Sequence, residues 1–187
     1  CLQKIFYNIK FEVEYLNRIG WNKKRYDING GIINEIKDGK GHIKEYDSYG
    51  CLKFEGEYLN GERNGIGKEY DNGKIKFEGE YLNGKSHRKG IEYDDNFKLK
   101  FEGEYLNGKR NGKGKEYDDN GKLKFEGEYS NDKRNGKGIE YDSDGKLKFE
   151  GEYSNGKRNG KGIEYDSDGK LKFEGEYLNG KKKFFYI

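Results

Sequence analysis

The segment that decides the fold reads KLKFEGEYSNGKRNGKGIEYDSDG and spans residues 146–169. From Leu147 to Tyr153 it alternates apolar or small residues with charged residues, which is the two-residue period of a strand with one buried face. Asn155-Gly156 follows, then a second alternating stretch around residues 161–165, then Asp168-Gly169. Both dipeptides are strong turn signals, because glycine adopts a positive φ at little steric cost. The segment therefore predicts one β-hairpin and the turn that leads to the next.

The same pattern recurs along most of the chain. The pentapeptide Phe-Glu-Gly-Glu-Tyr begins at six positions that are 23 or 24 residues apart: Phe54, Phe77, Phe101, Phe125, Phe149 and Phe173. Such repetition is typical of proteins in which each unit packs against its sequence neighbours. We expect residues 47–187 to be tandem hairpin repeats of about 24 residues, the last one truncated. Residues 1–46 carry two degenerate copies, which we expect to cap the stack.

Each first strand contains a glycine that would weaken it unless another side chain fills the space. We expect the glycine to lie under a neighbouring aromatic ring, because glycine in a strand marks close approach and rings can cover it. The structural repeat positions are therefore Phe125, Gly127, Tyr129, Phe149, Gly151 and Tyr153. A backbone opened for a ligand would not need copying in every repeat.

The composition is polar but not that of a disordered chain. Charged residues make up 39% and aromatic residues 16%, and 38 basic residues nearly balance 35 acidic ones. Mean hydropathy is −1.30. Large aromatic side chains supply much burial per residue, so the chain can fold if its rings share one face.

The cysteines and the first residues guide the expected localisation. Cys1 and Cys51 are too few for a disulfide framework or a metal-ligand cluster, which favours a reduced setting. Residues 1–7 lack the apolar stretch of a signal peptide, and no run of about 20 apolar residues predicts a membrane span. We expect a cytoplasmic protein, with peripheral attachment to a membrane or the cytoskeleton as an alternative.

The repeat unit resembles a known family. Phe149–Tyr153 followed by Asn155–Gly162 is similar to the MORN repeat, and the similarity is strong over residues 51–183 and weak over residues 1–50. The Asp-Gly-Lys-Leu-Lys junctions also resemble a bacterial antitoxin-like variant of that repeat. The resemblance implies an all-β, elongated, twisted antiparallel β-meander of stacked hairpins. It further implies a scaffold, self-association surface or membrane-proximal module, for which acidic phospholipid binding is often proposed, and no universal functional residues.

Two motifs imitate ligand-binding loops. Residues 79–86 fit the G-x-x-x-x-G-K-[ST] pattern, but a phosphate-binding loop must lead into a helix, and here a second strand is expected. The turns Asp142–Gly145 and Asp166–Gly169 resemble the start of a calcium loop and lack its later ligands. Both motifs are better explained by hairpin turns, so we expect no nucleotide and no resident metal; weak cation binding at the aspartate turns is a minor alternative.

The sequence offers no catalytic constellation. Glu150 and Glu152 recur in every repeat, and we expect them on a solvated strand face without a pocket. His42 and His87 are the only histidines, and neither has a cysteine nearby in the sequence. We expect His87 to be exposed in a hairpin turn. The sequence thus predicts no enzyme, no catalytic residue and no cofactor.

Charge is separated along each hairpin. Lys157, Arg158 and Lys161 gather at the turn within the repeat, whereas Asp166 and Asp168 lie at the turn between repeats. In a stacked sheet such turns recur about every 10 Å, and a membrane surface attracts each nearby basic residue by about 1 kcal/mol. The candidate contacts to an anionic surface are Arg63, Lys85, Arg88, Lys109, Arg110, Lys133, Arg134, Lys157 and Arg158. Simple solubility is the alternative explanation for this row.

Three hypotheses for the function follow. The first is a non-catalytic scaffold that binds a protein partner or forms a homodimer, and the second is peripheral binding of anionic phospholipid through the basic row. The third is an accessory repeat array of a larger enzyme. Nucleic acid is disfavoured, because the net charge is only +3 and the aromatic residues are needed for the core.

Overall fold

A computed structural model describes residues 11–16, 19–26 and 29–184, and these form antiparallel β-strands without a helix. Residues 1–10 of the predicted cap and residues 185–187 lie outside the described residues. The chain divides into two compact units, Cys1–Phe97 and Lys98–Ile187. The all-β expectation of stacked hairpins is confirmed.

The first unit contains eight strands within its described part. They are β1 (Phe11–Leu16), β2 (Ile19–Tyr26), β3 (Ile32–Lys37), β4 (Lys40–Tyr46), β5 (Leu52–Leu59), β6 (Glu62–Asp71), β7 (Lys74–Leu82) and β8 (Lys85–Tyr93). Each strand pairs antiparallel with the next one in the sequence. Residues 11–46, which belong to the degenerate N-terminal copies, thus form two hairpins.

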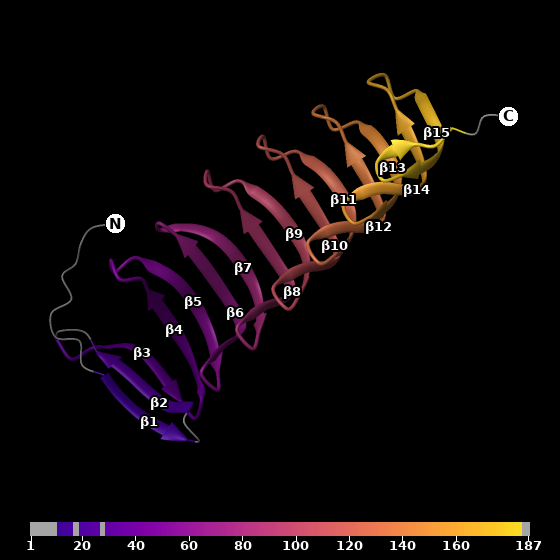
Figure 1. Cartoon of the computed structure of the whole chain (residues 1–187). Coiled ribbons are helices and arrows are strands. Elements are labelled where there is room, and N and C mark those ends of the chain that lie inside the picture. Colours follow the sequence, from indigo (N-terminus) through magenta and orange to yellow (C-terminus); the bar gives the residue numbers. More distant parts are fainter. Residues whose placement is uncertain (1–10, 17–18, 27–28, 185–187) are drawn as a thin grey trace. The chain divides into compact units, whose positions relative to one another are not determined.

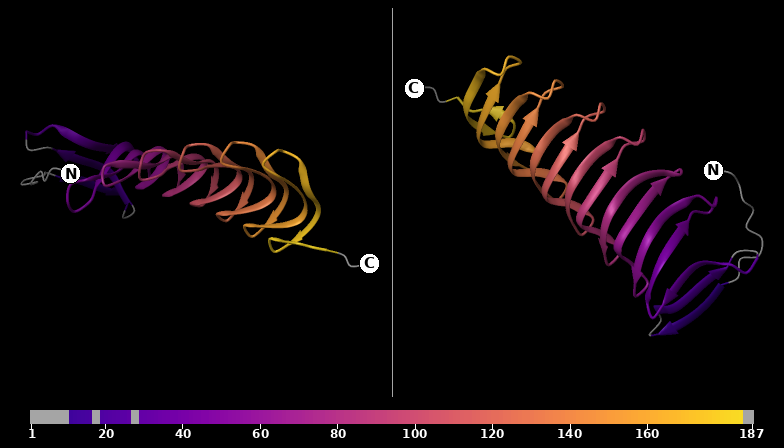
Figure 2. Two further views of the ribbon diagram at one scale, coloured as in Figure 1. Left: turned by 90° about the horizontal axis from the view of Figure 1, so that it is seen from above. Right: turned by 180° about the vertical axis from the view of Figure 1, so that it is seen from behind.

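The second unit repeats the same arrangement. Its described strands are β9 (Leu99–Leu106), β10 (Lys109–Tyr117), β11 (Leu123–Ser130), β12 (Lys133–Tyr141), β13 (Leu147–Ser154), β14 (Lys157–Tyr165), β15 (Leu171–Leu178) and the two-residue β16 (Lys181–Lys182). Consecutive strands again pair antiparallel. The hairpins of this unit follow one another in sequence order along an open sheet, as Figures 1 and 2 show.

The two kinds of turn explain the repeat length. Within a repeat, Asn155 (φ 50°) and Gly156 (φ 83°) form a tight turn in which both residues have a positive φ. Between repeats, the amide of Gly145 donates to the carbonyl of Asp142 at 3.0 Å. The Asp142 carboxylate accepts from the amides of Asp144 and Lys146, both at 2.9 Å. The aspartate thus stabilises its own turn, which accounts for the motif that resembled a calcium loop.

The core of each unit is a ladder of aromatic rings on one face of the sheet. Phe125 and Phe149 are completely buried, and Tyr129 and Tyr153 are only 4% and 5% exposed. Phe125 contacts Tyr129 edge-on with ring centres 5.7 Å apart, and it contacts Tyr153 of the next repeat at 5.3 Å. Each ring thus joins one repeat to the next, in the geometry that aromatic quadrupoles favour. We call this surface the aromatic face.

The strand glycines lie directly under these rings. A methyl group at Gly127 would come within 2.6 Å of the Gly138 Cα atom and 2.8 Å of the Phe125 ring. The corresponding Gly138 lies against both Phe125 and Tyr153. No side chain fits at these positions without moving the backbone or the ring, so glycine is required here by lack of space.

Candidate binding surfaces

A chain of ion pairs runs across the aromatic face of the second unit. Arg134 Nη2 lies 2.6 Å from Glu116, and its Nη1 lies 3.7 Å from Glu140. Arg158 repeats this geometry one repeat later, at 2.6 Å from Glu140 and 3.8 Å from Glu164. Each arginine therefore links two glutamates of successive repeats, and Glu140 links both arginines.

The arginines also cover the phenylalanine rings. The guanidinium of Arg134 lies 4.0 Å from the centre of Phe125, and that of Arg158 lies 3.9 Å from the centre of Phe149. The stacking uses the planar, delocalised charge of arginine, which lysine lacks. This contact shields the rings from water on the side that the sheet leaves open.

The glutamates of this chain are held in their ionised form. Burial by itself raises the pKa of the Glu140 carboxyl, but hydrogen bonds from Arg158 and Tyr153 outweigh it and leave the pKa below its usual value. Tyr153 donates to Glu140 at 2.6 Å, and burial followed by this bond raises the tyrosine pKa. At the last repeat Lys182 replaces the arginine and lies 3.0 Å from Glu164.

These contacts divide the predicted basic row into two groups. Arg63, Arg110, Arg134 and Arg158 lie over phenylalanine rings at 3.9–4.0 Å and are half-buried. Lys85, Arg88, Lys109, Lys133 and Lys157 are exposed at the turn edge. The register shift between Gly127 and Tyr129 turns the arginine onto the aromatic face beside the tyrosine. The structure thus does not bring the two groups together on one edge.

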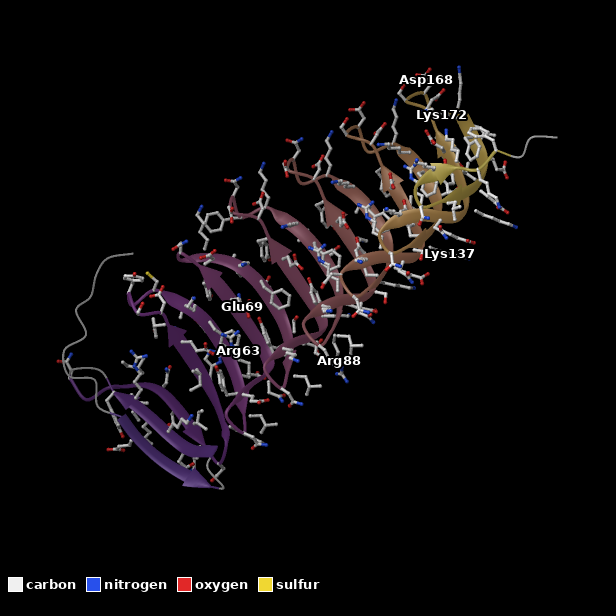
Figure 3. All side chains as sticks on the ribbon, viewed as in Figure 1. Arg63, Glu69, Arg88, Lys137, Asp168 and Lys172 are labelled. Carbon is white, nitrogen blue, oxygen red and sulfur yellow. The ribbon has the colours of Figure 1, made fainter. Side chains whose placement is uncertain are left out.

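The first unit shows the same arrangement with one interruption. Arg63 lies beside Glu69 in Figure 3, and their side chains are 2.7 Å apart. In the next repeat Ser86 stands opposite Tyr81, in the place that Arg134 takes opposite Tyr129. The Tyr81 hydroxyl is buried near Glu69 without a hydrogen bond of ordinary geometry in the described part of the chain. The ion-pair chain of this unit therefore lacks one cation.

The opposite side of the second unit, which we call the carboxylate face, has a groove. Its volume is about 690 Å³, within the usual range for ligand sites. It is lined by Lys137, Gly138, Ile139, Glu150, Gly151, Glu152, Lys161, Gly162, Ile163, Glu174, Gly175 and Glu176. The expectation that Glu150 and Glu152 lie on a strand face without a pocket is therefore wrong. The strand backbone forms the floor of the groove, and the longer side chains of neighbouring strands form its walls.

Two rows of side chains cross this groove. In the first row Glu150 stands between Ile139 and Ile163, which are its partners in the strand register on either side. In the second row, residues of opposite charge are register partners, Lys137 with Glu152 and Lys161 with Glu176. The groove thus combines an aliphatic and anionic row with a row of mixed charge.

Three other repeats place lysine where the groove has isoleucine, whereas Ile91 takes this position in the repeat that begins at Phe77. Lys44, Lys68 and Lys115 lie 3.4, 3.2 and 3.7 Å from the glutamates opposite them, Glu55, Glu78 and Glu102. In two successive repeats, Ile139 and Ile163 occupy the position of this lysine. Within the described residues, no ion pair involves Glu150 or Glu174, although Tyr165 donates a hydrogen bond to Glu150 at 2.7 Å. Glu150 and Glu174 are therefore carboxylates of the groove that lack an intramolecular ion pair in the described part of the chain.

The second glutamate of each repeat has a structural role. Glu152 accepts a hydrogen bond from the amide of Lys161 at 3.3 Å, beside Gly160, whose φ is 107°. Glu128 and Glu104 make the same contact to Lys137 and Lys113. This carboxylate holds the irregular backbone after the tight turn, so Glu150 and Glu174 are the carboxylates better placed to bind a ligand.

The remaining sequence motifs do not form ligand sites. Gly79 lies inside β7, and Gly84-Lys85 leads into the strand β8, so residues 79–86 have no helix to hold a phosphate. His87 lies within β8 and is half-buried, not exposed in a turn. His42 is exposed and lies 3.6 Å from Glu55. The described part of the chain contains no group of three metal-binding side chains.

The described cysteine differs from the expectation of a reduced setting. Cys51 is buried and disulfide-bonded, whereas Cys1 lies outside the described residues. Among the described residues there is also no helix with the length and apolarity that a bilayer crossing requires. The cytoplasmic localisation stays a prediction.

Comparison with known families agrees with the geometry. The MORN repeat matches residues 54–75, 77–96, 125–146 and 149–170, and a MORN repeat variant matches residues 110–131. Together these matches cover more than half of the chain. The chain belongs to the MORN-repeat family. Each of the four MORN matches spans one hairpin and the turn that follows it, whereas the variant match runs from β10 to the end of β11. MORN repeats are generally non-catalytic modules that bind proteins or membranes. No curated protein matches the sequence.

Proposed function

We propose that this MORN-repeat chain is a non-catalytic scaffold that holds a segment of a protein partner in the groove on its carboxylate face. The observation that supports this proposal is the loss of lysine at Ile139 and Ile163, which leaves Glu150 without an intramolecular cation. A partner with cationic side chains would supply the missing charges. The groove has no nucleophile beside a base, so binding fits its chemistry better than catalysis.

The mixed composition of the groove also favours a polypeptide. Four glutamates and two lysines give it a net negative charge, and two isoleucines add apolar surface. Protein partners recognise such sites through side chains that combine an aliphatic stem with a charged head. A small metabolite would need an enclosed site, whereas this groove continues across four strands, β12 to β15.

Selection from a displayed random-peptide library tests this function without knowledge of the partner. The library is panned on the wild-type protein and counter-selected on the Ile139→Lys/Ile163→Lys double variant, whose lysines copy the chain's own Lys115. We expect enriched peptides that bind wild type and not the double variant. Enrichment that the double variant retains in full would contradict a binding site in the groove.

A second copy of the chain is one protein partner to consider. Light scattering at increasing concentration measures the mass of the assembly directly. A dimer that the Ile139→Lys/Ile163→Lys substitutions dissociate would identify the groove as a self-association site. A dimer that persists in this variant would place self-association elsewhere on the chain.

Anionic phospholipid binding is a second candidate function, favoured by the exposed lysines at the turn edge. Lys109, Lys133 and Lys157 are exposed, and within the described residues none of them takes part in an ion pair. The half-buried arginines do not add positive charge to this edge. We therefore expect its attraction to an anionic membrane to be weaker than that of the full basic row.

Co-sedimentation with anionic and neutral vesicles tests the lipid candidate. The Lys109→Glu/Lys133→Glu/Lys157→Glu variant should lose binding to anionic vesicles. Its control, Lys100→Glu/Lys124→Glu/Lys148→Glu, makes the same change of charge at exposed strand positions. Equal loss in both variants would indicate a general charge effect and would reject the turn edge as the lipid site.

A further inference from the structure

The carboxylates of the groove have a fixed spacing that restricts the shape of a partner. Glu150 lies on β13 and Glu174 on β15, and both pair with Ile163 of the strand between them. Neighbouring strands lie about 4.8 Å apart, so the two carboxylates recur at roughly 10 Å along the direction that crosses the strands. A partner that lies along the groove must present its cations at the same interval.

Among regular backbone conformations, polyproline II meets this interval. It has 3 residues per turn and rises about 3.1 Å per residue, so every third side chain lies on the same edge about 9.3 Å apart. A β-strand returns to the same face after two residues, or about 6.6 Å, and misses the interval. An α-helix presents the same side after seven residues, or about 10.5 Å, and drifts from the carboxylates as repeats are added.

We propose that the groove on the carboxylate face binds a polyproline II segment of a partner protein with lysine or arginine at every third residue. This inference rests on the proposed scaffold function and specifies its ligand. The cations lie at Glu150 and Glu174, the residues between them contact Ile163, and the residues beyond the cation at Glu150 contact Ile139. Proline rings suit these isoleucines because they are apolar and preorganise the segment, which lowers the entropy cost of binding.

The rest of the groove agrees with this orientation. The second row has alternating charges, Lys137 opposite Glu152 and Lys161 opposite Glu176, and Lys183 lies 3.1 Å from Glu176. This row adds little net charge and leaves Glu150 and Glu174 as the main electrostatic contacts. The strand backbone at residues 151 and 162 forms the floor between the rows, because side chains at these positions would point to the aromatic face.

Two synthetic peptides of equal composition test the spacing. One is a nine-residue (Lys-Pro-Pro)3 peptide, and the other has three lysines followed by six prolines. With fluorescence anisotropy at low salt, we expect the repeating peptide to bind the full chain at least tenfold more tightly than its isomer. Equal affinities would overturn the proposed spacing, and (Glu-Pro-Pro)3 should not bind.

Substitutions within the chain test the site. Ile139→Lys/Ile163→Lys should weaken binding of (Lys-Pro-Pro)3 at least tenfold, because each lysine pairs with the glutamate opposite it. The control, Leu106→Lys/Leu178→Lys, adds the same charge at positions that are 46% and 57% exposed and should change affinity less than twofold. Equal loss in both double variants would show that only net charge matters and would overturn the site.

The opposite substitution should increase affinity. Lys115→Ile removes the ion pair to Glu102 and extends the isoleucine row by one repeat. We expect severalfold tighter binding of (Lys-Pro-Pro)3, which loss of fold could not produce. Unchanged or weaker binding would contradict the extension of the site.

The two proposals can fail separately. If library-selected peptides need the groove and (Lys-Pro-Pro)3 does not bind, the ligand chemistry is wrong and the scaffold function stands. If neither binds, both fail.

Discussion

Arg158 stacks on Phe149, with its guanidinium 3.9 Å from the centre of a ring that is completely buried. The same arginine donates to Glu140 of the preceding repeat and approaches Glu164 of its own. One side chain thus covers the core, satisfies a half-buried carboxylate and joins two repeats. The folding stability of this chain should therefore depend on cationic side chains that the sequence pattern alone would place at the surface.

Loss of one arginine should destabilise the second unit. We expect Arg134→Ala to lower the free energy of unfolding by about 2–3 kcal/mol, because it leaves Glu116 without its principal cation and uncovers Phe125. Arg134→Lys should recover only part of this loss, since lysine cannot form the planar stack. Urea denaturation measures both, with exposed Lys133→Ala as the control; similar midpoints for Arg134→Ala and Lys133→Ala would contradict the role of the ion-pair chain.

Restoring the missing cation of the first unit should stabilise it. Ser86→Arg would place a guanidinium opposite Tyr81, where other repeats have one. We expect a gain of about 1 kcal/mol from the stacking and ion-pair contacts, whereas Ser86→Ala should give none. Thermal unfolding provides the comparison, and a lower melting temperature for Ser86→Arg than for Ser86→Ala would show that the site does not accept the side chain.

The strand glycines and the turn glycines should differ in their tolerance to substitution. Gly127→Ala would force a methyl group to within 2.6 Å of the Gly138 backbone, so we expect a loss of about 2–3 kcal/mol. Gly145 has a φ of 80° and open space around it, and Gly145→Asn should cost about 1 kcal/mol or less, since asparagine tolerates this conformation. Equal costs in chemical denaturation would refute a packing role for Gly127.

Acid should weaken the chain through its paired glutamates. Hydrogen bonding to Lys172, opposed by burial and reinforced by Lys182, lowers the pKa of Glu164 from 4.5 to about 2. A lowered pKa in the folded state means that the ionised glutamate stabilises the fold above pH 4.5. This contribution is lost as the pH falls from about 4.5 through 2. Glu140, whose pKa is also lowered, should act in the same direction.

Urea midpoints between pH 7 and pH 2 measure this effect. Glu164→Gln should be less stable than wild type at pH 7 and should approach it as the pH falls to 2, because Glu164 then becomes protonated in the folded wild type as well. Lys100→Gln, an exposed change outside the ion-pair chain, should remain parallel to wild type. A constant difference between Glu164→Gln and wild type across the whole range would exclude ionisation as the cause.

The hairpins could be predicted from the sequence because their signals are local. Alternation from Leu147 to Tyr153 and the Asn-Gly turn determine the strand, its faces and the direction of return. The glycine under a ring was also inferred from one repeat, and Gly127 indeed lies against Phe125. Strict repetition then extends each local inference to the next copy.

The binding surfaces depend on contacts between strands that the one-dimensional pattern does not contain. The basic row was expected on one exposed edge, but the register shift between Gly127 and Tyr129 turns Arg134 onto a ring. Ile163 lies in the alternating stretch that was predicted around residues 161–165. Its importance appears only when Glu150 and Glu174 are found opposite it.

The sequence by itself determined the hairpin repeat, its family and the chemical character of each strand face, because alternation, turns and spacing are properties of neighbouring residues. The tertiary structure alone decided which charges remain available. Burial over Phe149 removes Arg158 from the surface, and strand pairing places Glu150 between two isoleucines in a groove. Whether a charged side chain pairs within the chain or faces a partner depends on residues one or two strands away.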